Sequence, residues 1–169
     1  MSAIVAIEIL KATGLGSKHN LEKVSYAALF KDIMFSDREE WLLIDSFEEL
    51  ENRHLSEVDW DRVFGHALDA AVLVQKARDI PIGVEELIRH HHGVSNGKGF
   101  SLGQIDSLPD VSIVFILAVD FVNQLYAYQR NRDPEAKPVI GTLKERFAHS
   151  HKAGKFLSEL NKRLKKRKP

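Results

Sequence analysis

Residues 109–128, PDVSIVFILAVDFVNQLYAY, form the stretch that decides the fold. Pro109 and Asp110 are typical of the first turn of a helix, and the residues that follow make this the most hydrophobic segment of the chain. Its longest apolar run, Ile113 to Val119, is far shorter than the roughly 20 residues that cross a bilayer. The stretch therefore predicts a buried core helix and no membrane span.

Helical signals extend outward from this segment in both directions. Apolar residues recur at helical spacing from Val58 to Ala77, with an alanine-rich face, and Pro81 and Gly93 bracket a further helix from Val84 to His92. No segment shows convincing strand alternation. The sequence therefore predicts an all-α, single-domain bundle of roughly six to eight helices. Further helices are expected at 4–10, 21–28 and 36–44, the last with a capped start at 36–40, and turns at 14–17, 95–99 and 133–134.

Length and charge limit the class of protein. The chain has 169 residues, 24 basic and 24 acidic, with no cysteine, which excludes thiolate metal sites and disulfides. A formal net charge of zero removes the global attraction on which duplex nucleic-acid binders depend. We expect a soluble, cytoplasmic helical domain at 1–160 and a basic tail at 161–169, the whole being attached to a longer signalling protein.

Three consecutive histidines give the strongest chemical signal. The apolar face of Val84, Leu87 and Ile88 continues at helical spacing onto His91 and His92, so both imidazoles are predicted to point inward. Neutral imidazole is the commonest metal ligand in proteins, which favours metal or phosphate chemistry for this pair. The ordinary alternative is a helix C-terminus where histidine stabilises exposed carbonyls, and we adopt it for His90.

Three more polar residues interrupt apolar helices. Asp120 follows seven apolar residues, and a buried carboxylate must be paired, protonated or metal-bound. Asp32 has the same character, although a Lys31–Asp32 pair at a helix end is a common alternative, and His66 could equally be a core histidine. A set of His and Asp converging in a helical bundle suits iron, manganese or zinc. The candidate ligands are Asp32, His66, His91, His92 and Asp120.

Four ordered motifs resemble the HD-GYP family of metal-dependent phosphohydrolases, whose members hydrolyse cyclic di-GMP. Residues 26–33, YAALFKDI, are similar to the family's AALLHDIG segment, and His66 lies where the family has its HPE histidine. Residues 88–101, IRHHHGVSNGKGFS, resemble the HHERxDGxGYP signature, and residues 116–125, ILAVDFVNQL, resemble its aspartate-bearing helix. The resemblance implies an HD-superfamily bundle in which Asp32 bridges metals and His66, His91, His92 and Asp120 are further ligands.

Departures from the family motifs accompany this resemblance. Lys31 replaces the histidine of the HD doublet, and its ammonium would repel a metal cation. Phe35 stands where the family has a phosphate-binding lysine, and Phe100 retains the aromatic ring of the GYP tyrosine without its hydroxyl. Lys31 and Asp32 are the candidate catalytic residues, and Lys98 and Phe100 the candidate substrate-binding ones.

Two functions follow from the resemblance. The preferred one is a degenerate HD-GYP-like signalling domain with at most one divalent ion and weak or no hydrolysis, binding a cyclic dinucleotide or a protein partner, with a homodimer as the candidate assembly. The alternative is an active, metal-dependent cyclic di-GMP phosphodiesterase with a reduced site. A regulatory HDOD-type bundle is disfavoured by the retained His91–His92 pair.

Overall fold

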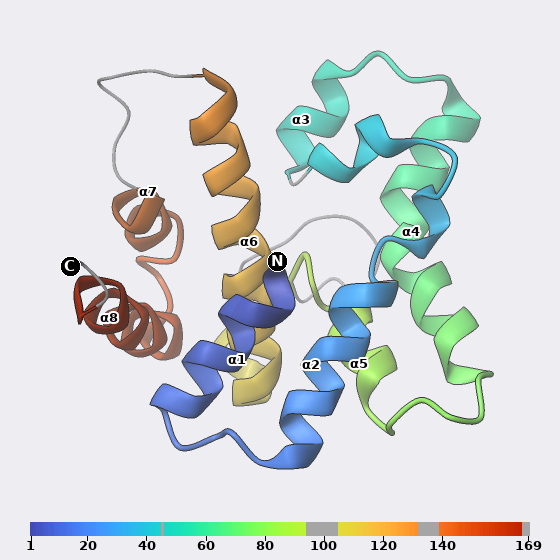
Figure 1. Ribbon diagram of the computed structural model, residues 1–169. Coiled ribbons are helices and arrows are strands. Elements are labelled where there is room, and N and C mark those ends of the chain that lie inside the picture. The colour runs from blue at the N-terminus through green and yellow to red at the C-terminus, as the bar shows by residue number, and fades with distance from the viewer. Residues whose placement is uncertain (45, 94–104, 132–138, 167–169) are drawn as a thin grey trace.

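The computed structural model describes residues 1–44, 46–93, 105–131 and 139–166. Over these ranges the chain forms eight α-helices and three short 3₁₀ helices and contains no strand, which confirms the predicted all-α bundle (Figure 1). The elements in chain order are α1 (Ser2–Ala12), α2 (Lys18–Phe30), η1 (Ile33–Phe35), η2 (Glu39–Leu43), α3 (Phe47–Asn52), α4 (Glu57–Gln75), α5 (Val84–Arg89), η3 (Ile105–Ser107), α6 (Asp110–Asn131), α7 (Val139–Arg146) and α8 (His151–Lys166).

Helix α6 is the core of the bundle. Every residue from Ile113 to Val119 is at least 98% buried, against neighbours that include α1, α5, α7 and α8. By length and composition Asp110–Gln129 would also pass as a membrane span. Burial of its apolar residues inside the bundle is the arrangement expected of a core helix in a soluble protein.

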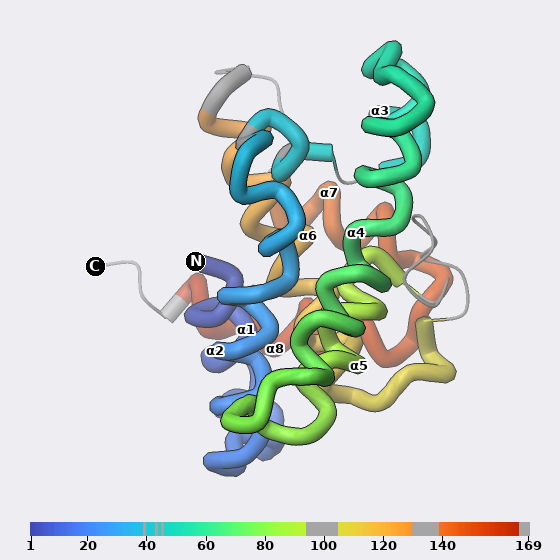
Figure 2. The backbone as a smooth tube through the Cα atoms, turned by 90° about the vertical axis from the view of Figure 1, so that its right-hand side faces the viewer, coloured from blue at the N-terminus to red at the C-terminus, as the bar shows by residue number. Residues whose placement is uncertain are grey.

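Helices α4 and α5 form the other side of the molecule, together with α2 (Figures 1 and 2). Ala67, Ala70 and Ala71 on α4 are at least 98% buried, so the predicted small-residue face lies in the core. Small side chains let neighbouring helices approach closely, and α5 is the main neighbour of α4. This approach brings the end of α5 to the middle of α4.

A second hydrophobic cluster lies apart from the main core. It consists of Phe35, Trp41, Ile44, Leu50 and Val63, and it attaches residues 33–50 to the first half of α4. Arg62 of α4 also holds this segment against the helix. It donates hydrogen bonds to both carboxylate oxygens of Asp37 (2.6 and 3.2 Å) and to the Met34 carbonyl (2.8 Å).

The predicted helix at 36–44 is wrong. Ser36 directly follows the 3₁₀ helix η1 instead of starting an α-helix, and the segment contains the 3₁₀ helix η2. Trp41 and Ile44, three residues apart, are both buried, which matches the three-residue period of a 3₁₀ helix. Asp37, expected in the first turn of an α-helix, is drawn to Arg62 instead. The capping serine of this region is Ser46, which accepts from the Glu49 amide at the start of α3.

The C-terminal helix is continuous with the bundle. The predicted boundary between 160 and 161 falls inside α8, whose last fully described turns include the buried Leu160 and an Arg163–Glu8 ion pair of 3.1 Å to α1. The first part of the basic segment is therefore helical and contacts the body of the protein.

Candidate metal centre

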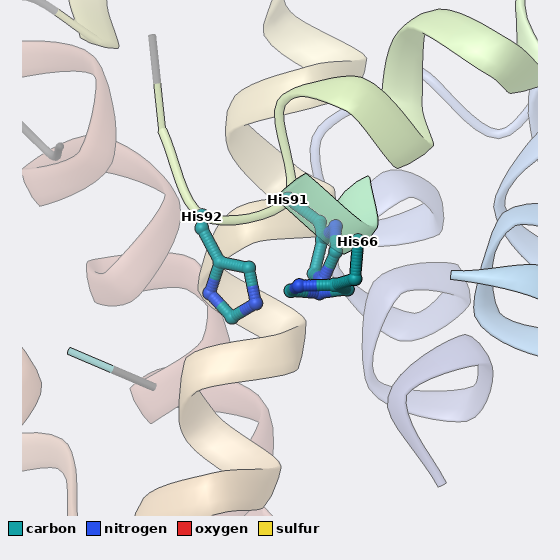
Figure 3. Close-up of side chains that lie close together, drawn as sticks. All are labelled: His66, His91 and His92. Atoms are coloured by element: carbon teal, nitrogen blue, oxygen red, sulfur yellow. The ribbon is translucent and has the colours of Figure 1, made fainter. Parts of the chain in front are cut away.

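Three helices deliver the candidate ligands to one place. His66 lies in the middle of α4, His91 and His92 follow α5, and Asp32 comes directly after the end of α2. The helix predicted over 84–92 stops at Arg89, and the Ile88 carbonyl accepts from both the His91 amide (3.3 Å) and the His91 Nδ1 (2.6 Å). Figure 3 shows the three imidazoles turned toward one another.

Hydrogen bonds to the backbone fix the tautomers of two of these histidines. The His66 Nδ1 lies 2.6 Å from the Val63 carbonyl, and the His91 Nδ1 lies at the same distance from the Ile88 carbonyl. A carbonyl oxygen can only accept, so both Nδ1 atoms carry the proton. In the neutral rings the Nε2 atoms then hold lone pairs, which is the form in which histidine binds metals.

These lone pairs face each other. The Nε2 atoms of His66 and His91 are 3.3 Å apart, and Asp32 Oδ1 lies 3.9 and 3.6 Å from them. One ring nitrogen from each of His66, His91 and His92 lies within 4.8 Å of the corresponding nitrogens of the other two. Two ligands on one tetrahedral ion, each at about 2.1 Å, are separated by about 3.4 Å. The donor set and its spacing thus fit a single divalent cation.

Burial keeps the imidazoles neutral. It lowers the pKa of His66 to about 3, lowers the pKa of His91, and lowers that of His92 well below the ordinary value. The positive charge of Lys31 acts in the same direction on His92. All three rings are therefore uncharged near neutrality and able to bind a cation through nitrogen.

Lys31 supplies a positive charge within this cluster. Its Nζ contacts Asp32 Oδ2, while Oδ1 of the same carboxylate faces the histidines. Although burial raises the pKa of Asp32, the Lys31 ammonium holds it well below its usual range. The predicted Lys–Asp pair and the predicted histidine cluster thus share one carboxylate.

Asp120 makes a different contact. It is 94% buried on α6, and its Oδ2 forms an ion pair of 3.3 Å with Nε of Arg146 on α7. Burial raises the pKa of Asp120 despite this positive charge. The Arg146 guanidinium also lowers the pKa of His92, so its charge acts on the histidine cluster as well as on the carboxylate. Of the five expected ligands, four are brought together, and the fifth is paired with arginine.

Some predicted residues have other surroundings than expected. His90, expected at an exposed helix end, is 92% buried, and its Nδ1 has no hydrogen-bond partner in the described parts of the chain. Lys98 and Phe100 lie outside the described residues. Phe35, expected at a phosphate site, is buried with its ring 4.5 Å from that of His66. It shields the imidazole from water.

Arg146 is the residue that sequence reasoning missed. It occupies a polar, basic stretch in which nothing distinguishes it from Lys144 or other exposed cations. Its partner Asp120 is 26 positions away on another helix, and no local spacing rule relates the two. The buried Asp120 implied that a partner must exist, but its identity depended on how α7 packs on α6.

Comparison of the chain with protein-family models, with curated proteins and with solved structures gives no match.

Proposed function

We propose that this chain is a degenerate HD-GYP-like signalling domain that binds one divalent cation and has weak or no hydrolytic activity. The observation that carries the proposal is the Lys31 ammonium on Asp32, directly beside the converging His66 and His91 nitrogens. The cluster combines a cation-binding donor set with a fixed positive charge of its own. The four motifs that resemble the HD-GYP family supply the class of domain.

Binding of one ion follows from the donor geometry. The neutral His66, His91 and His92 offer nitrogen ligands, and Asp32 Oδ1 offers an oxygen on the same side. A cation between the two facing Nε2 atoms would remove the repulsion of their lone pairs. Nitrogen and carboxylate ligands without thiolate favour zinc, manganese or iron.

Weak hydrolysis follows from Lys31 and Phe35. A bound divalent ion would activate a water molecule or polarise a phosphate oxygen, and two-ion sites do both at once. Lys31 forms an ion pair with Asp32 Oδ2, so only the Oδ1 oxygen of this carboxylate is left to bind a metal ion. The positive charge of Lys31 also repels a second cation. Phe35, at the position of the family's phosphate-binding lysine, has no positive charge with which to bind a phosphate. The residues therefore support cation binding, with a cyclic dinucleotide as a weak ligand in a cytoplasmic signalling protein.

Metal content is the first test. Chelator-treated protein should take up one Zn²⁺ or Mn²⁺ per chain in a titration followed by calorimetry and elemental analysis. His91→Ala should weaken this affinity by at least about 100-fold, because it removes a buried ligand. His19→Ala, on the exposed surface of α2, is the matched control and should bind as the native chain does. Two or three tightly bound ions would contradict the proposal.

Cyclic di-GMP turnover is the second test. The native chain should show background turnover with iron, manganese or zinc, and Lys31→His alone should change this little, because hydroxide formation and phosphate positioning act jointly. Robust hydrolysis by the native chain that disappears in His91→Ala would instead establish the alternative, an active phosphodiesterase.

A further inference from the structure

The neutral net charge of the chain conceals two oppositely charged regions. Residues 36–62 contain ten Asp and Glu against three Arg, whereas residues 144–165 contain seven Lys and Arg against two Glu. The first region comprises η2, α3 and the start of α4, and the second comprises the end of α7 and most of α8. Helices α3 and α8 lie apart in Figure 1 and remain apart in the turned view of Figure 2.

A partly exposed group of aromatic rings lies in the acidic region. Phe47 of α3 meets Trp60 and Phe64 of α4 edge-on, with ring centroids 6.3 Å apart in each case, and Trp60 stacks on Phe64 at 4.6 Å. Phe47 is 42% exposed and the neighbouring Val58 is 76% exposed. Large apolar side chains grouped at a surface are typical of contact sites, whereas single ones are ordinary.

Carboxylates without ionic partners flank these rings. On α4, Glu57 lies three residues before Trp60 and Asp61 lies three residues before Phe64, hence on the same stripe, and Glu48 and Glu51 lie on α3 next to Phe47. All four are exposed, and none forms an ion pair with another described residue. We call this surface the acidic–aromatic face: Phe47, Glu48, Glu51, Glu57, Trp60 and Asp61.

Helix α8 presents the complementary surface. Ala153, Phe156, Leu157 and Leu160 are buried on its inner side. The opposite stripe carries exposed side chains at helical spacing, and Lys155 and Lys165 on it form no ion pair within the described chain. We call this stripe the basic face: His151, Lys155, Lys162 and Lys165.

We propose that the acidic–aromatic face of one copy docks on the basic face of α8 in a second copy. The charges are complementary, and lysine can lay its aliphatic stem on an aromatic ring while its ammonium meets a carboxylate. Within one copy the two faces are too far apart to meet. Because they are different surfaces, the contact is heterologous and repeats from copy to copy, giving chains or rings rather than a closed symmetric pair.

Sedimentation velocity tests this proposal. At low ionic strength the native chain should form species larger than a monomer as its concentration rises, and salt should reverse this because the charges are exposed. Glu51→Gln with Asp61→Asn should weaken association at least about 10-fold, and so should Lys155→Gln with Lys165→Gln. Asp69→Asn with Asp79→Asn, equal in charge change to the first variant and remote from both faces, should associate as the native chain does.

Mixing the two interface variants gives the sharpest result. Each should associate weakly alone, but the first retains its basic face and the second its acidic–aromatic face. An equimolar mixture should therefore form a one-to-one dimer and nothing larger. A monomeric native chain at low salt, a monomeric mixture, or loss of association in the Asp69/Asp79 control would each overturn the proposal, leaving these faces to other partners or to none.

Discussion

Two buried polar groups lie side by side in this bundle and differ in how their charges are balanced. In the histidine cluster, three neutral rings and one carboxylate oxygen converge, and the Lys31 ammonium contacts the far oxygen of Asp32. In the second group, the Asp120 carboxylate meets the Arg146 guanidinium directly. The first group could hold a cation. The second already contains one.

This difference separates Asp120 from the other four expected metal ligands. Asp120 was expected beside the histidines because a buried carboxylate needs a counter-charge, and arginine meets that need without a metal. Asp32 keeps one oxygen toward the rings because lysine, a compact point charge, engages the other. Four of the five residues therefore remain together as a candidate site.

The largest expected effect is on stability at acidic pH. The pKa of His66 is about 3 in the fold against 6.5 in the unfolded chain, and those of His91 and His92 are also lowered. Lowered histidine pKa values contribute stability above pH 6.5 that is lost as the pH falls toward the folded values, since the unfolded chain binds more protons. The loss is about 1.4 kcal/mol per pH unit for each histidine that stays neutral.

Urea unfolding of metal-free protein between pH 7 and 4 measures this slope. His66→Leu should reduce it by about one proton. His19→Gln, an exposed histidine, should leave it unchanged. A slope that is the same in His66→Leu and the native chain would mean that the cluster is not buried and neutral.

Removing the arginine of the second group should have the next largest effect. Arg146→Met leaves the Asp120 carboxylate buried without its cation, at a cost of about 3 kcal/mol in the free energy of unfolding. Asp120→Asn in the same chain should recover part of this loss, because the uncompensated charge is gone. If the single variant is as stable as the native chain, the two groups do not differ in the way described above.

The sequence predicted the fold better than the site. The long apolar run of α6 and the periodicity of α4 each specify a helix locally, so the bundle class could be predicted from periodicity alone. The inward direction of His91 could also be predicted from the face it continues, although the helix itself ends earlier. The partner of Asp120 depends on how α7 packs against α6, which no local sequence pattern predicts. The 3₁₀ helices η1 and η2 likewise depend on the contact of their segment with Arg62.

A smaller effect is expected where the second hydrophobic cluster meets the histidines. Phe35 is 97% buried, and its ring lies against His66. Phe35→Leu should cost about 1.5 kcal/mol or less, since it changes shape more than volume. It should also weaken metal binding a few-fold, whereas Phe115→Leu in the main core should reduce stability alone. If both variants change the metal affinity equally, the contact of Phe35 with His66 does not contribute to metal binding.

The smallest effect is expected at the C-terminal end of α8, remote from both polar groups. Leu160 is the last residue of the helix that is buried, and Lys165 is exposed. Arg163 pairs with Glu8, but the two side chains are 41% and 24% exposed, and such surface pairs contribute about 0.2–1 kcal/mol. Deleting residues from Lys165 onward retains that pair and removes no buried apolar group, so the melting temperature should change by less than about 2 °C. Arg163→Ala should lower it by a comparable small amount. A fall of many degrees in the deletion variant, measured by circular dichroism against the native chain, would show that the final residues contact the body and would make the end of α8 part of the structural core.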